Sequence, residues 1–212
     1  PTRAFGRFEL RQLLGKSSGT MAWLAFDPRS GNEVMLTLPR VQPGDAPALE
    51  HWLRDARLAA RLNHPNLARV AEVGVQDHWP FIAVDREQGV TLKEWLVSRA
   101  NAKPAEVVGW VCDLLQGLAF AHEAGVAHLD PQLHNILISD RGAVRLMALA
   151  GAGDSARAAQ VANASGAHER NMAMDPSELR AQRTAAARDL LACGVLLQHL
   201  LTGQPALDQP DT

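Results

Sequence analysis

Cysteine is scarce in this sequence of 212 residues, which contains only Cys112 and Cys193. The two cysteines lie far apart, each within an apolar pattern typical of a helix, so they form neither a disulfide framework nor a metal site. Proteins without disulfides are typical of reducing compartments, and we therefore expect a cytoplasmic location.

Excess charge of one sign and long hydrophobic runs are also lacking. The chain has 21 basic and 23 acidic residues and a net charge of -2 at pH 7, which excludes the basic surface that holds a nucleic-acid backbone. The longest apolar run, residues 190–201, is interrupted by Gln198 and His199 and is shorter than the ~20 residues that span a bilayer. A hydrophobic content of 47% is enough for one or two packed domains. We expect a globular protein with no nucleic-acid partner and no membrane segment.

The first half of the chain alternates between strand-like and helix-like patterns. Runs rich in β-forming residues, separated by turn-rich segments, occur at residues 8–14, 21–26, 33–38, 68–75 and 79–84. Between the third and fourth runs, apolar residues recur at helical spacing over residues 48–62, and the helix must end before Pro65. The sequence therefore predicts an antiparallel meander and two further strands, five in all, with one helix.

The second half is mainly helical. Pro104 suits the first turn of a helix in which two adjacent apolar stripes predict burial on a wide face: Val107, Val111, Leu114 and Leu118, and Val108, Cys112, Leu115 and Ala119. Short strands at residues 136–138 and 143–147 flank a turn, and a second buried helix is expected over residues 185–201. Residues 150–167 are mostly alanine, glycine and serine, which favours a mobile loop over an alanine-rich helix.

One motif carries a resemblance to a known family. His128, Asp130 and Asn135 have the His-x-Asp-x-x-x-x-Asn spacing of the protein kinase catalytic loop, and a short apolar strand follows. Residues 14–25 have the register of the kinase strand, glycine-rich turn and strand, and residues 189–203 resemble the kinase αF helix. The chain thus resembles a bacterial Ser/Thr protein kinase of degenerate type, a pseudokinase.

The resemblance implies an α+β, two-lobed protein-kinase-like fold. Residues 1–86 correspond to a small N-lobe with a five-stranded antiparallel sheet and one helix. Residues 87–212 correspond to a partial, mainly helical C-lobe, and the helices that follow αF in a whole kinase domain have no counterpart in this sequence. A hinge is expected near residues 85–89.

The resemblance also assigns site positions. Asp130 stands at the position of the catalytic base, and Asn135 at that of a metal ligand. A degenerate nucleotide pocket is implied at Gly15, Ser17, Ala22, Met35, Thr37, Asp55, Val84 and Leu137. His128, Asp130 and Asn135 also hydrogen-bond the loop backbone in the family, and a structural role for them is favoured over catalysis or a metal site that includes His134.

Several groups that phosphoryl transfer requires are missing. Thr37 replaces the lysine that grips the phosphates, and Ala148 replaces the aspartate that binds magnesium, so no metal site is expected. Asp55 stands at the position of the glutamate that pairs with that lysine, but a surface carboxylate near Arg54 and Arg57 is the favoured interpretation. Met35 either fills the adenine slot or packs in an ordinary core beside Val84. The exposed-loop interpretation of Lys16 is favoured over a substitute phosphate grip. ATP and magnesium binding should be absent or very weak.

The resemblance and the missing groups together predict a catalytically inactive domain. We expect a protein-binding or regulatory module in bacterial signalling, with a protein partner or an attached effector domain. The alternative is a weak or unconventional ATP-dependent Ser/Thr protein kinase that uses Asp130 and Asn135.

Overall fold

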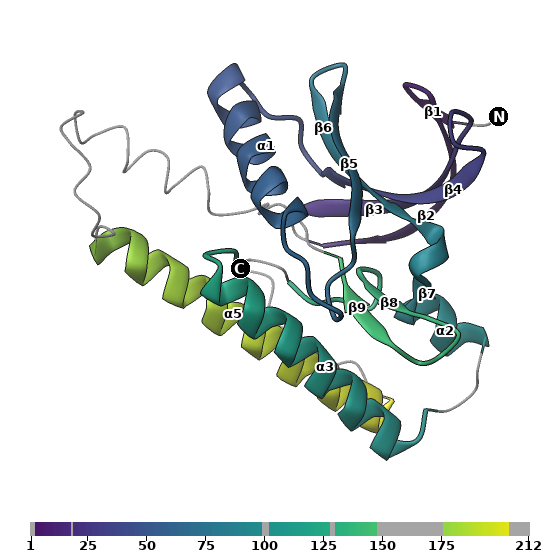
Figure 1. Ribbon diagram of the computed structural model, residues 1–212, viewed down its shortest axis with the longest axis vertical. Coiled ribbons are helices and arrows are strands. Elements are labelled where there is room, and N and C mark those ends of the chain that lie inside the picture. The colour runs from purple at the N-terminus through teal and green to yellow at the C-terminus, as the bar shows by residue number, and fades with distance from the viewer. Residues whose placement is uncertain (1–2, 18, 99–101, 128–129, 148–175, 204–212) are drawn as a thin grey trace.

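The computed structural model describes residues 3–17, 19–98, 102–127, 130–147 and 176–203. A curled antiparallel sheet with one helix beside it forms one lobe, and a mainly helical lobe lies next to it (Figure 1). The α+β, two-lobed fold expected from the sequence is confirmed.

The sheet of the N-lobe has six strands, in the order β1-β2-β3-β4-β6-β5, with every neighbouring pair antiparallel. The strands are β1 (Arg3–Phe5), β2 (Phe8–Lys16), β3 (Thr20–Asp27), β4 (Asn32–Pro39), β5 (Val70–Gln76) and β6 (Trp79–Asp85). The five predicted strands are confirmed, but the expected number of strands was wrong because β1 is also present. Three residues are too few to show an alternating pattern, and β1 forms by pairing with β2.

The two faces of this sheet pack differently. On one face Phe5, Phe8 and Phe81 form an aromatic cluster in which the Phe8 and Phe81 ring centroids are 5.3 Å apart at 78°. The other face carries Leu14, Ala22, Met35 and other small or flexible side chains, and it faces helix α1 and the second lobe. Because side chains alternate between the two faces of the sheet, the aromatic cluster packs on the outer face, and the cluster around Met35 packs on the face toward the second lobe.

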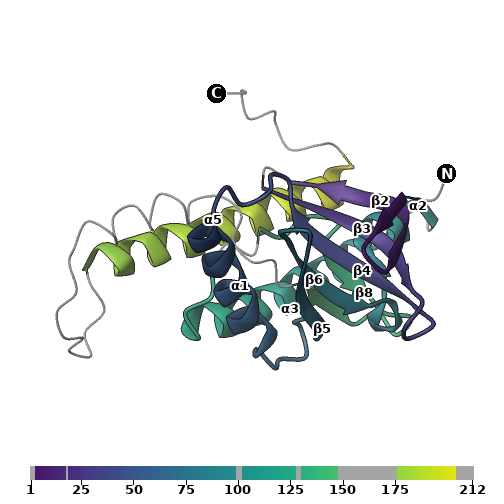
Figure 2. The ribbon, with the colours of Figure 1, turned by 90° about the horizontal axis from the view of Figure 1, so that it is seen from above.

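Helix α1 (Ala46–Ala60) lies beside β5 and β6 (Figure 2). It begins two residues earlier than predicted, because the Asp45 side chain accepts a hydrogen bond from the Ala48 backbone amide at 2.8 Å and caps the helix. Pro47 occupies the first turn, where its missing amide hydrogen costs nothing. Trp52, Leu53 and Ala56 are buried against the sheet.

The C-lobe is built on two long helices, α3 (Pro104–Glu123) and α5 (Pro176–Thr202), which run side by side (Figure 1). The hinge contains a short 3-10 helix, η1 (Arg86–Gln88), and leads through β7 (Val90–Thr91) into helix α2 (Leu92–Ser98). A small sheet joins β7 to β8 (Ile136–Ile138) and β9 (Val144–Leu146). Between β8 and β9, Gly142 adopts a φ of 79°, a left-handed conformation that favours glycine.

The expected burial of the long helices needs correction. The stripe of Val107, Val111, Leu114 and Leu118 is buried as predicted, but the adjacent stripe of Val108, Cys112, Leu115 and Ala119 is exposed. Helix α3 packs along one side only in the described structure, so a single stripe is enough to cover its contact with α5 and β9. Helix α5 starts earlier than residue 185, and its Leu190, Leu191 and Val195 are exposed. The predicted loop at residues 150–167 lies outside the described residues.

A charge network ties together three parts of the N-lobe. The Arg7 guanidinium donates hydrogen bonds to both Asp27, at 3.1 Å, and Glu72. Burial of Asp27 opposes its ionisation, but the hydrogen bonds from Arg7 and from the Arg29 backbone amide outweigh burial and lower the pKa of Asp27. The pKa of Glu72 is also lowered, chiefly by its hydrogen bonds to Arg7.

Asp27→Asn should lower the free energy of unfolding at pH 7 by about 1–2 kcal/mol, because Arg7 loses one charged acceptor. The pKa values of Asp27 and Glu72 lie below their ordinary values of 3.8 and 4.5 in the folded state. Their stabilisation is therefore complete above those values and is lost as the pH falls through the folded pKa values. Urea denaturation at pH 7 and pH 3 measures both effects, and the difference between Asp27→Asn and the parent should shrink at pH 3.

Arg11→Met is the matched control, because Arg11 forms a comparable ion pair with Glu33 that is exposed to solvent. Exposed pairs contribute little, so this variant should unfold almost as the parent does. An equal loss for both variants would contradict the assignment of stability to the Arg7 network.

Candidate functional site

Helix α5 holds the segment that contains Asp130 and Asn135, residues 130–135. Asp189 on that helix is 1% exposed and accepts a hydrogen bond from the Asp130 backbone amide at 3.0 Å. Its other carboxylate oxygen lies 2.8 Å from Nε2 of His122, at the end of α3. Asp130 has a φ of 37°, a left-handed conformation that is uncommon for a residue other than glycine. One buried carboxylate therefore joins two helices to this segment, which we call the catalytic-loop segment.

Hydrogen bonds within the catalytic-loop segment engage both ends of the Asn135 amide. The Gln132 backbone amide donates to Oδ1 of Asn135 at 2.6 Å, and Nδ2 of Asn135 donates to the Asp130 carbonyl at 2.8 Å. The Gln132 side chain donates to Oδ1 of Asp130 at 3.1 Å. The amide oxygen that would be offered to a metal ion is thus already a backbone acceptor. The Asp130 carboxylate is only partly buried.

Met35 lies where the two lobes meet and is 0% exposed. It belongs to one hydrophobic cluster that joins the N-lobe side chains Leu14, Ala22 and Val84 to the C-lobe side chains Leu137 and Met147. The predicted adenine-contacting residues therefore pack against one another. Met35 was expected either to fill the predicted adenine slot or to pack in a core beside Val84. Both expectations describe this arrangement, because the predicted slot and that core occupy the same place.

Two further predicted positions carry no phosphate-binding geometry. Thr37 is buried on β4, in register with Ala22 and Ile82, and its side chain is neutral. The Asp55 carboxylate lies 3.4 Å from Nε2 of His51 and 4.0 Å from Nε of Arg54, its neighbours along α1. This placement matches the favoured interpretation of a surface carboxylate near Arg54.

Hydrogen bonds between Ser17 and Thr20 close the connection between β2 and β3, which we call the glycine-rich turn. The Ser17 amide lies 2.9 Å from the Thr20 carbonyl oxygen, and the Thr20 amide lies 3.1 Å from Oγ of Ser17. Lys16 is exposed, as predicted, but it is the last residue of β2, in register with Met21, and not part of a loop. Gly15 lies directly against the side chain of His134.

His134 and Lys93 are site residues to which sequence reasoning gave little or no role. His134 is 6% exposed, and burial lowers its pKa, with Asp130 opposing and Lys93 adding to that effect. Lys93 on α2 donates from Nζ to the Leu14 carbonyl at 3.1 Å. Both contacts cross the cleft between residues far apart in the chain, and no local pattern reports them.

Among the described residues, no group of three or more His, Cys, Asp or Glu side chains is placed to hold a metal ion. Ala148 and His128 lie outside the described residues. A hard divalent cation prefers several oxygen ligands, and the Asn135 amide oxygen, which already accepts from the Gln132 backbone, could supply only one.

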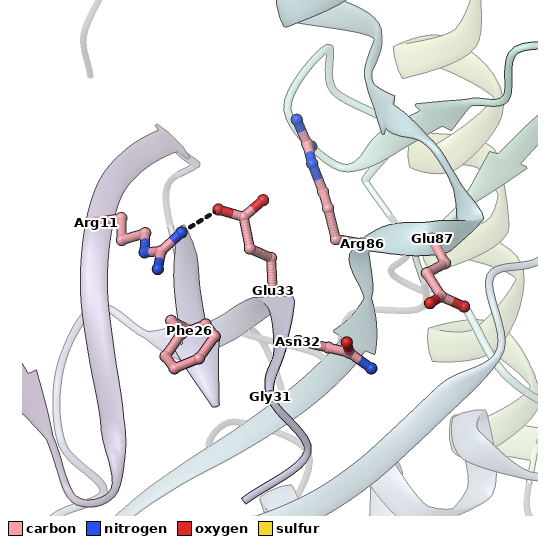
Figure 3. A pocket seen from close by; sticks show the side chains of 7 residues that line it. All are labelled: Arg11, Phe26, Gly31, Asn32, Glu33, Arg86 and Glu87. Carbon is pink, nitrogen blue, oxygen red and sulfur yellow. Dashed lines mark hydrogen bonds and ion pairs between the residues drawn. The ribbon is translucent and has the colours of Figure 1, made fainter. Parts of the chain in front are cut away.

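A cavity of about 330 Å³ opens beside the hinge (Figure 3), and its lining does not include the predicted nucleotide residues, although Arg86 lies 3.9 Å from the Met35 sulfur. Its lining residues are Arg11, Phe26, Gly31, Asn32, Glu33, Arg86 and Glu87. The charged groups are largely paired: Arg11 with Glu33, and Arg86 with Glu94 through two hydrogen bonds of 2.9 and 2.8 Å. Glu94 also accepts from the Thr91 backbone amide, so it fixes the hinge to the start of α2.

Comparisons with known proteins agree with this architecture. The protein kinase domain family matches residues 8–212. A probable serine/threonine-protein kinase of Streptomyces coelicolor is 30% identical over 97% of this chain and 31% of its own length. Serine/threonine-protein kinase PrkC of Bacillus subtilis is 25% identical over 97% of this chain and 32% of its length. The chain thus spans about a third of the length of these curated relatives.

Two solved structures share the fold. The kinase domain of Mycobacterium tuberculosis PknI superposes with a TM-score of 0.64 and 21% identity, covering 100% of this chain and 80% of that one. Rad53 residues 1–466, solved in complex with AMP-PNP, superposes with a TM-score of 0.66 and 16% identity, covering 98% of this chain and 52% of that one. Among the described residues, no helix is long and apolar enough to cross a membrane.

Proposed function

Because this chain belongs to the protein kinase domain family, we propose that it is a pseudokinase domain, which binds and regulates proteins without transferring phosphate. Its partner is another protein or a further domain attached to it, in bacterial Ser/Thr kinase signalling. The curated relatives are much longer than this chain, which is consistent with attached domains.

The burial of Met35 carries this proposal. A nucleobase between the lobes would have to displace a side chain that is 0% exposed and separate Leu14 and Ala22 from Leu137. Protein interiors are close-packed, so a planar ring cannot enter without that rearrangement. Separating these apolar side chains would also cost part of the hydrophobic stabilisation that joins the lobes.

The phosphate end of the predicted site supports the same conclusion. Phosphoryl transfer depends on cations that hold the phosphates and neutralise the developing charge. Thr37 is neutral and buried, and the Asn135 amide oxygen already accepts from the Gln132 backbone. The sequence places Ala148 at the position of the magnesium-binding aspartate. With these groups, neither ATP nor magnesium is expected to bind appreciably.

A second candidate function rests on Asp130. Its carboxylate is only partly buried and keeps an oxygen that the Gln132 side chain does not occupy. A weak or unconventional ATP-dependent Ser/Thr protein kinase would use Asp130 as the base and Asn135 as its remaining polar partner. This alternative requires Met35 to leave the space between the lobes.

A phosphoryl-transfer assay distinguishes the two functions. With magnesium or manganese and radiolabelled ATP, the protein should incorporate no more phosphate into itself or a generic protein substrate than the Asp130→Asn variant does. Asp130→Asn keeps the size of the side chain and removes the base, so it sets the background. Phosphate incorporation by the parent that disappears in Asp130→Asn would favour the kinase.

A further inference from the structure

We propose that His134 is a latch that holds the glycine-rich turn closed on the catalytic-loop segment, so that the cleft opens only when this contact breaks. The inference goes beyond the proposed function, because it concerns how the two lobes separate. It applies equally to an active and to an inactive domain.

The latch depends on the absence of a side chain at Gly15. A Cβ atom added there would lie 2.4 Å from Cγ and 2.6 Å from Cβ of His134, closer than such atoms approach in proteins. Gly15 lies within β2 and is not among the glycines with positive φ, so its backbone conformation does not require glycine. Glycine at this position therefore serves the close approach of the His134 side chain.

The burial of His134 makes two opposing contributions to the free energy of the closed state. The side chain is 6% exposed, and no described residue forms a hydrogen bond with its buried Nε2 atom. A buried nitrogen without a partner costs free energy, which is recovered when the turn lifts and water reaches it. Packing against Gly15 opposes this gain. Opening would thus exchange the packing of His134 against Gly15 for the hydration of Nε2.

A second contact acts on the neighbouring residue. Lys93 donates from its ammonium group to the Leu14 carbonyl at 3.1 Å. The C-lobe therefore holds two consecutive residues at the end of β2, Leu14 and Gly15. The β2–β3 pairing is irregular between Leu13 and Gly15, and such irregularities let a strand bend locally. The end of β2 can lift at that point while the rest of the sheet stays paired.

A double-mutant cycle tests the contact itself. Gly15→Ala adds a methyl group against His134 and should lower the melting temperature by roughly 5 °C. Adding His134→Gly removes both the ring and the Cβ atom that obstruct the new methyl group, and should restore at least half of that loss, because the two changes share one contact. Equal losses from Gly15→Ala in the presence and absence of the His134 side chain would overturn the proposal.

Gly74→Ala provides the matched control. Gly74 is also a strand glycine whose added Cβ would lie 2.5 Å from a ring, Cζ of Phe81, but that ring belongs to the aromatic cluster on the other face of the sheet. His134→Gly should not restore the stability lost by Gly74→Ala. Rescue of both glycine variants would indicate a general effect of His134→Gly and would count against a latch.

Hydrogen exchange of the His134→Ala variant tests the motion. The Ser17 and Thr20 amides, which close the glycine-rich turn, should exchange on the order of tenfold faster than in the parent. Amides of the β5–β6 pair should keep their parental rates. Unchanged exchange at Ser17 and Thr20 in this folded variant would overturn the proposal, and no nucleotide or phosphate transfer enters the measurement.

Discussion

A variant that carries Met35→Ala, Thr37→Lys and Ala148→Asp is expected to bind ATP with magnesium at least about tenfold more tightly than the parent chain. Met35→Ala removes a fully buried side chain from the cluster that also contains Ala22 and Leu137. Thr37→Lys places a cation on β4 for the phosphates. Ala148→Asp supplies a carboxylate for the metal ion at the position assigned by the sequence.

The three changes should be strongly coupled. A lysine at residue 37 has little to bind while Met35 excludes the nucleobase, and a carboxylate at residue 148 holds a metal ion best when phosphates complete its shell. Each single variant should therefore resemble the parent in calorimetric titrations with and without magnesium. Asp55→Glu can be added to position the new lysine.

Stability must be measured beside binding in this series. Met35 is 0% exposed, so Met35→Ala should cost about 2–5 kcal/mol of unfolding free energy. Thermal melts identify the variants that remain folded at the titration temperature. If a folded triple variant shows no more magnesium-dependent ATP binding than the parent, the assignment of these three positions to a nucleotide site is wrong.

Asp189→Ala should destabilise the protein by about 3–5 kcal/mol. The Asp189 carboxylate is 1% exposed and is held by His122 and by the Asp130 backbone amide. Its removal leaves a buried amide without an acceptor and a histidine without its charged partner, at the junction of α3, α5 and the catalytic-loop segment. Urea denaturation at pH 7 measures the loss.

Two variants calibrate that measurement. Asp189→Asn keeps one acceptor oxygen and should lose less stability than Asp189→Ala. Asp113→Ala changes a half-buried carboxylate on α3 and should unfold nearly as the parent does. A loss below about 1 kcal/mol for Asp189→Ala would show that the catalytic-loop segment does not depend on this carboxylate.

Local patterns were sufficient for most of the fold. Runs rich in β-forming residues located the long strands, and the spacing of apolar residues located α1, α3 and most of α5. β1, α2 and β7 are too short to show a period and form through contacts with neighbouring elements. Periodicity also could not tell which side of α3 would be covered, because the position of Val108 or Leu115 relative to α5 is a tertiary property.

The positions of the candidate-site residues along the chain could be predicted, but the long-range contacts between them could not. Motif spacing located Asp130 and Asn135, and the hydrogen bonds around them are largely local. His134 and Lys93 act across the cleft, on Gly15 and Leu14, and residues so far apart leave no signal in a single sequence. The roles assigned to the degenerate nucleotide positions, and the lobe boundary between residues 86 and 87, remain predictions.

The central claim is that the space between the lobes holds the chain's own side chains instead of a nucleotide. A thermal melt of the parent protein with millimolar ATP, with and without magnesium, tests it most directly. Ligand at a hundred times its dissociation constant would stabilise the fold by ~2.7 kcal/mol, which raises the melting temperature by several degrees. The closed cluster around Met35 predicts no magnesium-dependent change in melting temperature, and a reproducible rise of several degrees that requires magnesium would contradict it.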